Sequence, residues 1–121
     1  MHINKIYFLI ENEWNGRRYN NPSEVVKLCD EALLIEPKSI LVLYHKGLAY
    51  LSFTTNIREN TFKAKECFKE VVNKSPQFWR AWHYLGICNE LQGDQFLTNA
   101  LYCYSKARAY ERIEKNINNN K

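Results

Sequence analysis

Three histidines and four cysteines are the side chains with which this chain would hold a metal ion or carry out redox chemistry. They are His2, His45, His83, Cys29, Cys67, Cys88 and Cys103. The intervals between successive cysteines are 38, 21 and 15 residues, so no pair has the CxxC spacing of zinc knuckles and thiol–disulfide motifs. Because each cysteine has apolar neighbours at helical spacing, we expect buried free thiols, a reducing compartment such as the cytoplasm, and no metal or other cofactor.

The remaining candidates for catalysis have simpler explanations. His45 and His83 are expected on two neighbouring helices, but no further ligands stand at a spacing that would complete a metal site. Ser23, Ser39 and Ser75 stand where helix-capping residues belong. The chain has no glycine-rich phosphate loop, HExxH or GxSxG motif. We therefore expect a binding protein and not an enzyme.

A repeated pattern of small, large and small residues indicates the elements that position these side chains. In each of three segments the second residue follows the first by four positions and the third follows the second by three. The segments are Val25, Cys29 and Ala32; Ala64, Phe68 and Val71; and Ala100, Tyr104 and Ala107. Such steps place all three residues of a segment on one helix face. Pro37 and Pro76 follow the first two segments at the same distance.

A glycine precedes the second and third segments. Gly47 and Gly86 are 39 residues apart, as are Pro37 and Pro76, and each glycine lies in an apolar, aromatic-rich stretch. We expect each unit to be a helix pair, with Gly47 facing Ala64 and Gly86 facing Ala100, so that the paired backbones approach closely.

Capping signals divide the chain into six expected helices, and the expected caps include Asn21, Ser39, Asn56 and Ser75. Their approximate ranges are 3–16, 22–36, 39–54, 57–74, 76–92 and 94–115. Residues 1–115 then form one domain of three antiparallel pairs, at about 3–36, 39–74 and 76–115, and residues 116–121 form a disordered tail. No stretch of about 18 apolar residues and no secretory signal pattern is present.

The chain resembles tetratricopeptide-repeat proteins over roughly residues 3–115. The third unit carries most of the resemblance, through Trp82, Leu85, Gly86, Gly93, Asp94, Ala100, Tyr104 and Ala107. Asn89 departs from the pattern, because the family prefers tyrosine there. The resemblance implies an all-α fold in which about three helix pairs form a right-handed α-α superhelix, a solenoid whose inner face is lined by the first helix of each pair.

The resemblance also implies that this concave face binds a peptide or a partner helix, as in an adaptor, a scaffold, a co-chaperone-like protein or an assembly factor. By the repeat register the groove residues are Trp14, Arg17, Tyr44, His45, Leu48, Arg80, His83, Tyr84 and Ile87. Some members of the family clamp the acidic C-terminus of a chaperone with Lys, Arg and Asn side chains. Only Arg80 matches that set, so we expect no chaperone-tail receptor of that kind.

Two other kinds of partner stay open. The last helix has more apolar residues than one face needs and no predicted solvating helix follows it, which favours a homodimer or a homo-oligomeric scaffold. RNA binding is less favoured. Residues 61–121 hold 10 basic and 6 acidic residues, whereas residues 1–60 hold 7 of each, but acidic neighbours interrupt any basic stripe. We expect no membrane partner.

Overall fold

The computed structural model describes residues 2–120, and within them it contains six α-helices, one 3-10 turn and no β-strand. The elements are α1 (Ile3–Asn12), α2 (Pro22–Ile35), α3 (Ile40–Leu51), α4 (Ile57–Lys74), α5 (Trp79–Leu91), η1 (Asp94–Phe96) and α6 (Leu97–Asn119). The prediction of an all-α fold is therefore confirmed. No helix within residues 2–120 has the length and the apolar character needed to cross a membrane.

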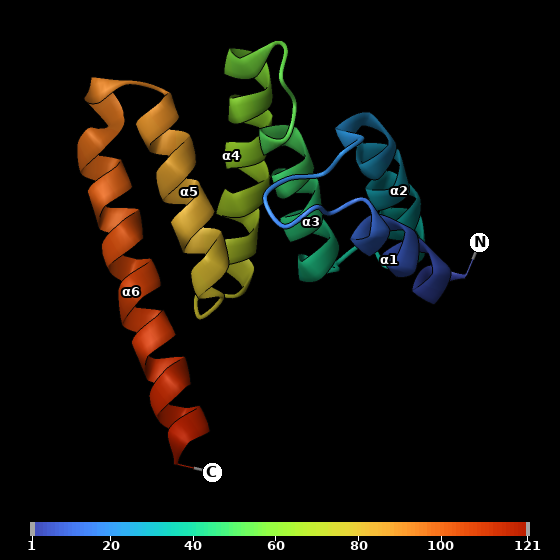
Figure 1. Cartoon of the computed structure of the whole chain (residues 1–121). Coiled ribbons are helices and arrows are strands. Elements are labelled where there is room, and N and C mark those ends of the chain that lie inside the picture. The colour runs from blue at the N-terminus through green and yellow to red at the C-terminus, as the bar shows by residue number, and fades with distance from the viewer. Residues whose placement is uncertain (1, 121) are drawn as a thin grey trace.

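The helices form a row in which each one packs against the next along the chain. Figure 1 shows the row running from α1 and α2, through α3 and α4, to α5 and α6, with α2 to α6 pointing alternately down and up. The connections between the helices are short. The apolar core lies between successive helices and includes the fully buried Ile10, Cys29, Phe68 and Cys88.

Side-chain caps fix the starts of α2 and α3. The Asn21 carboxamide oxygen accepts the Glu24 N–H at 3.2 Å, with Pro22 at the first helical position. The Ser39 hydroxyl oxygen accepts the Val42 N–H, also at 3.2 Å. Both caps occur where the sequence indicated them.

Two other predicted caps are absent from the structure. Asn56 precedes α4 in the left-handed region, at φ 50°, and makes no capping hydrogen bond through its side chain. Ser75 ends α4 instead of starting α5, which begins at Trp79 after a turn. Pro76 favours this turn because it cannot donate a hydrogen bond and disfavours helical backbone at the residue before it.

The first helix ends at Asn12 and not at residue 16 as predicted. Gly16 has φ +97°, a conformation that favours glycine and ends the regular backbone. The Asn15 side-chain oxygen accepts the N–H groups of Arg17 and Arg18, each at 3.0 Å, and an isolated antiparallel bridge joins Trp14 to Tyr19. Residues 13–21 therefore form a compact loop that folds back toward α3.

The last helix is longer than predicted. It continues to Asn119, so residues 116–119 are helical where the sequence indicated a disordered tail, and residue 121 lies outside the described residues. No glycine or proline follows Gly93, and an existing helix extends at low cost because each added residue gains one hydrogen bond. Figure 1 shows α6 projecting well past the end of α5.

The two helical glycines make room for aromatic rings. A Cβ atom on Gly47 would lie 2.7 Å from the Phe68 ring, and one on Gly86 would lie 2.6 Å from the Tyr104 ring. In both units the side chain nearest to the glycine is therefore the aromatic one, Phe68 or Tyr104. It is not the predicted alanine, Ala64 or Ala100. Helices α3 and α4, and likewise α5 and α6, pack through a ring seated on a glycine.

Candidate functional site

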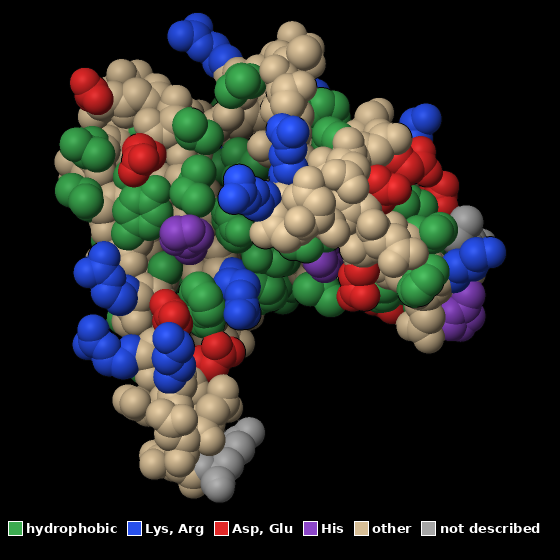
Figure 2. Space-filling view, in the orientation of Figure 1, with side chains coloured by type: hydrophobic (Ala, Val, Ile, Leu, Met, Phe, Trp, Pro, Cys, Tyr) green, Lys and Arg blue, Asp and Glu red, His purple; other side chains and the backbone are tan. Residues whose placement is uncertain are grey.

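A cavity of about 330 Å³ opens on the face shared by α1, α3 and α5. We call it the central pocket, and its lining residues are Glu11, Trp14, Tyr19, Tyr44, His45, Leu48, Arg80 and Tyr84. Figure 2 shows this side of the molecule, where hydrophobic side chains gather near the centre. A pocket of this size, apolar with a few polar groups, is typical of ligand sites.

Six of the nine predicted groove residues line the central pocket: Trp14, Tyr44, His45, Leu48, Arg80 and Tyr84. The other three do not. Arg17 is exposed in the loop of residues 13–21. His83 is exposed and packs against Tyr104 on α6, with ring centroids 5.7 Å apart. Ile87 lies further along α5 and is half-buried.

Glu11 and Tyr19 line the central pocket although the sequence interpretation did not select them. Tyr19 reaches the site because the loop of residues 13–21 folds back. Its N–H donates to the Ser52 hydroxyl oxygen at 3.0 Å, and its own hydroxyl is 2.5 Å from Nδ1 of His45. The Asn15–Gly16 dipeptide is a turn signal that would have indicated this reversal.

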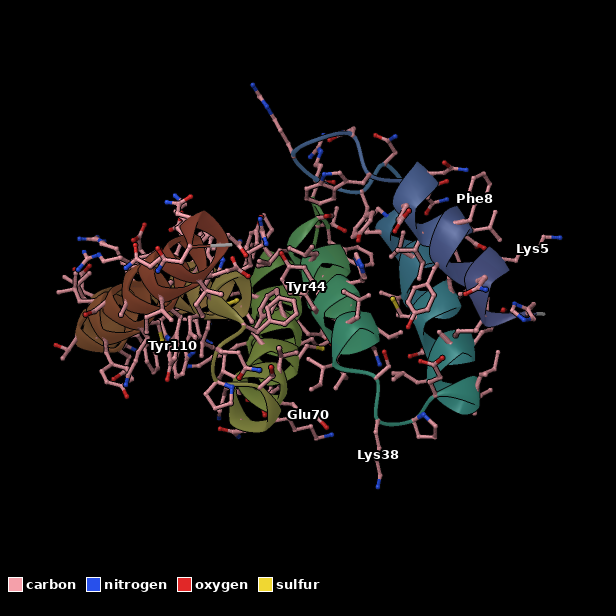
Figure 3. The ribbon with its side chains drawn as sticks, turned by 90° about the horizontal axis from the view of Figure 1, so that it is seen from below. Lys5, Phe8, Lys38, Tyr44, Glu70 and Tyr110 are labelled. Atoms are coloured by element: carbon pink, nitrogen blue, oxygen red, sulfur yellow. The ribbon has the colours of Figure 1, made fainter. Side chains whose placement is uncertain are left out.

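Tyr44 lies at the centre of an aromatic cluster. Its ring centroid lies 4.8 Å from that of Phe78, 6.0 Å from that of Phe68 and 6.1 Å from that of Tyr84. Figure 3 shows its side chain between α3 and α5. These contacts join α3 to α4, to α5 and to the residue before α5, so the core fixes the floor of the pocket.

The Tyr44 residue is only 8% exposed, yet its hydroxyl keeps contact with solvent at the pocket. Within residues 2–120 the only buried polar side-chain atom without a partner is the Asn89 side-chain oxygen. Burial raises the pKa of Tyr44 above its ordinary value, so this hydroxyl stays protonated and able to donate at neutral pH.

His45 is neutral at physiological pH. Burial lowers its pKa, and the negative charge of Glu11 opposes this shift without reversing it. A neutral imidazole can accept the Tyr19 hydroxyl proton at Nδ1, which leaves the other ring nitrogen as a donor. The histidine therefore contributes a hydrogen-bonding edge to the pocket and no positive charge.

Two opposite charges lie at the pocket wall. Glu11 comes from the last turn of α1 and Arg80 from the first turn of α5, and neither forms an ion pair within residues 2–120. The Arg80 guanidinium lies over the Trp79 ring, 4.4 Å from its centroid, which holds it in place while leaving its donors free. The pocket wall thus carries one exposed charge of each sign.

No group of three or more His, Cys, Asp or Glu side chains within residues 2–120 is arranged to hold a metal ion. All four cysteines are free, and Cys29, Cys88 and Cys103 are buried. Comparisons with protein-family models, with curated proteins and with solved structures found no match to this chain. The functional argument therefore rests on the residues of the chain itself.

Proposed function

We propose that the chain is a protein-binding module of the tetratricopeptide-repeat type. In this proposal its three helix pairs follow a right-handed superhelix, and α1, α3 and α5 present the binding face. The equivalent glycine–ring contacts of Gly47 with Phe68 and Gly86 with Tyr104 support a structural repeat. The regular row of helices supports it as well.

The central pocket is the observation that carries the proposal. Its lining comes from three helices and a loop that are far apart in the sequence, and all three helices are first members of their pairs. Aromatic floors with a few fixed polar groups are typical of the places where an anchor residue of a partner inserts. The proposed partner is a protein or peptide.

The lining also indicates the form of the bound segment. A large apolar or aromatic side chain would fill the space between Leu48 and Tyr84, and a carbonyl or carboxylate oxygen would accept from the Tyr44 hydroxyl. An acidic residue of the partner would pair with Arg80 and a basic one with Glu11. A short amphipathic segment with mixed charge satisfies all of these conditions.

Binding, as an adaptor or assembly factor, is proposed in preference to catalysis. The hydroxyl that meets a base in the pocket is that of Tyr19, at Nδ1 of His45. This hydroxyl is a poor nucleophile, because the side chain is only 2% exposed and burial raises its pKa. The free thiols support a reducing compartment such as the cytoplasm as the place of action.

The test is affinity capture from a cell lysate followed by mass spectrometry. The baits are the native chain, a Glu11→Lys/Arg80→Glu double variant and Tyr44→Phe, which removes only the hydroxyl. The matched control is Lys38→Glu, an exposed charge in the α2–α3 turn away from the pocket (Figure 3). Partners that the native chain and the control capture should be lost with the double variant and reduced with Tyr44→Phe. Partners retained by all four baits would exclude the central pocket as the binding site.

A further inference from the structure

A row of residues at every fourth position crosses the exposed side of α6. We call it the α6 ridge, and its residues are Leu97, Leu101, Ser105, Ala109, Ile113 and Ile117. The four large members are 47%, 61%, 53% and 55% exposed in that order, and Ser105 and Ala109 are exposed as well. Four well-exposed Leu and Ile side chains on one helix are more than a solvated face needs.

The uncovered side of α6 is a consequence of its place in the row. Its inner side, with Ala100, Cys103 and Ala107, is buried against α5. Helix α4, the second helix of the preceding pair, is covered on both sides because α5 follows it, and the Phe68 ring stacks on that of Tyr84 at 5.7 Å. Within residues 2–120, α6 packs against α5 and η1, and Figure 1 shows no other helix on its far side.

The α6 ridge reads the same in both directions: two large residues, two small ones, two large ones. Successive residues of the row are turned by about 40° around the helix, so Leu97 and Ile117 lie on opposite flanks of α6. A two-fold axis between Ser105 and Ala109 that reverses the helix direction would place Leu101 beside Ile113 of a second copy. The small residues then meet at the centre and the large ones at both ends. Such a face is complementary to itself.

The packing of helices gives this symmetry a definite geometry. Ridges formed by residues four apart interdigitate best when two helices cross at about −50°, the commonest class in globular proteins. Small side chains at the crossing point allow the backbones to approach closely. Ser105 and Ala109 stand at the middle of the ridge, where that close approach is needed.

We propose that the α6 ridge is a self-association surface, through which two copies of this chain pair with antiparallel α6 helices. The part of the ridge that faces the second copy runs from Leu101 to Ile113, about 18 Å of helix. One helix pair buries less than the roughly 800 Å² per partner of a standard interface, so the dimer belongs to the weak, concentration-dependent class. The dimer leaves the central pocket open, because α6 does not line it.

The experiment measures the mass of the native chain by light scattering and sedimentation from about 5 μM to about 0.5 mM. The expected result is a shift from monomer toward dimer across that range. Leu101→Glu alone and Ile113→Lys alone should each weaken association at least about tenfold. Leu34→Glu is the matched control, because Leu34 lies on α2, is 85% exposed and lies outside the ridge; it should leave association unchanged.

The double variant Leu101→Glu/Ile113→Lys tests the antiparallel register. In the proposed dimer each introduced glutamate faces an introduced lysine of the second copy, so association should recover. In a parallel pair like charges would meet and association would stay weak. Circular dichroism checks that every variant is helical. A native chain that stays monomeric throughout the range, or a double variant no better than the single ones, overturns the proposal.

Discussion

Gly47 lies directly beneath the ring of Phe68: a Cβ atom on the glycine would come within 2.7 Å of two of its ring carbons. Gly86 and Tyr104 repeat this relationship in the next unit, at 2.6 Å. The two rings differ in their surroundings, since Phe68 is fully buried while Tyr104 is partly exposed. The same contact is therefore rigid in one unit and adjustable in the other.

Gly47→Ala should destabilise the fold by about 1–2 kcal/mol, because the buried Phe68 ring has no room to move aside. Gly86→Ala should cost less, because the Tyr104 ring can turn toward solvent. Alanine by itself stabilises a helix by about 1 kcal/mol relative to glycine. The variant Ala109→Gly, at an exposed position of α6, measures this helix-propensity difference in this chain. Urea unfolding gives all three values. A Gly47→Ala variant more stable than the native chain would contradict the seated-ring packing.

Two buried asparagines should respond to alanine to different extents. The Asn89 side-chain oxygen is buried with no partner within residues 2–120, while its amide nitrogen donates to the Leu85 carbonyl at 3.1 Å and to Cys103 Sγ at 3.7 Å. The Asn60 amide donates to the Thr55 carbonyl at 3.0 Å across the start of α4. Asn89→Ala removes an unsatisfied oxygen together with these hydrogen bonds, so it should change the free energy of unfolding little, whereas Asn60→Ala should lower it by about 1 kcal/mol. Thermal unfolding measures both values, and a larger loss for Asn89→Ala than for Asn60→Ala would contradict this prediction.

The thiols should be almost inert in the folded chain. Burial raises the pKa of Cys29 and of Cys88 to about 12 and that of Cys67 to about 11, so little reactive thiolate exists at pH 8. Labelling with an aromatic disulfide reagent should be slow in buffer and should reach all four thiols quickly in guanidinium. Cys67, which is only half-buried, should react first. Rapid native labelling of Cys29 would show that α2 opens readily.

The helix pairs were predictable because their information is local. Spacings of three and four residues fix which side of a helix is buried. Helix starts are marked by single residues such as Pro22 and Ser39. The repeat register, taken from the family resemblance, selected Tyr44, His45 and Tyr84, and these three residues line the central pocket.

Tyr19 could not be selected in the same way, because its position depends on a chain reversal. Its hydroxyl meets His45 only after Gly16 adopts a positive φ and the loop closes on Ser52. The partners of Gly47 and Gly86 were missed for a related reason. Whether a glycine faces an alanine or a ring one turn further depends on the axial shift between two helices, which sequence spacing does not specify.

Stability should fall below neutral pH because of His45. Burial lowers the pKa of His45 in the folded chain below its value in the unfolded chain, which is near 6.5. Between these two pH values the unfolded chain binds more protons than the folded chain. The stabilisation that depends on a neutral His45 is therefore complete above about pH 6.5 and is lost as the pH falls toward the folded pKa. His45→Gln should remove part of this slope, whereas His83→Gln, at an exposed position, should keep it. Urea midpoints at pH 7.5 and 5.5 measure the difference, and a slope unchanged by His45→Gln would mean that other groups cause it.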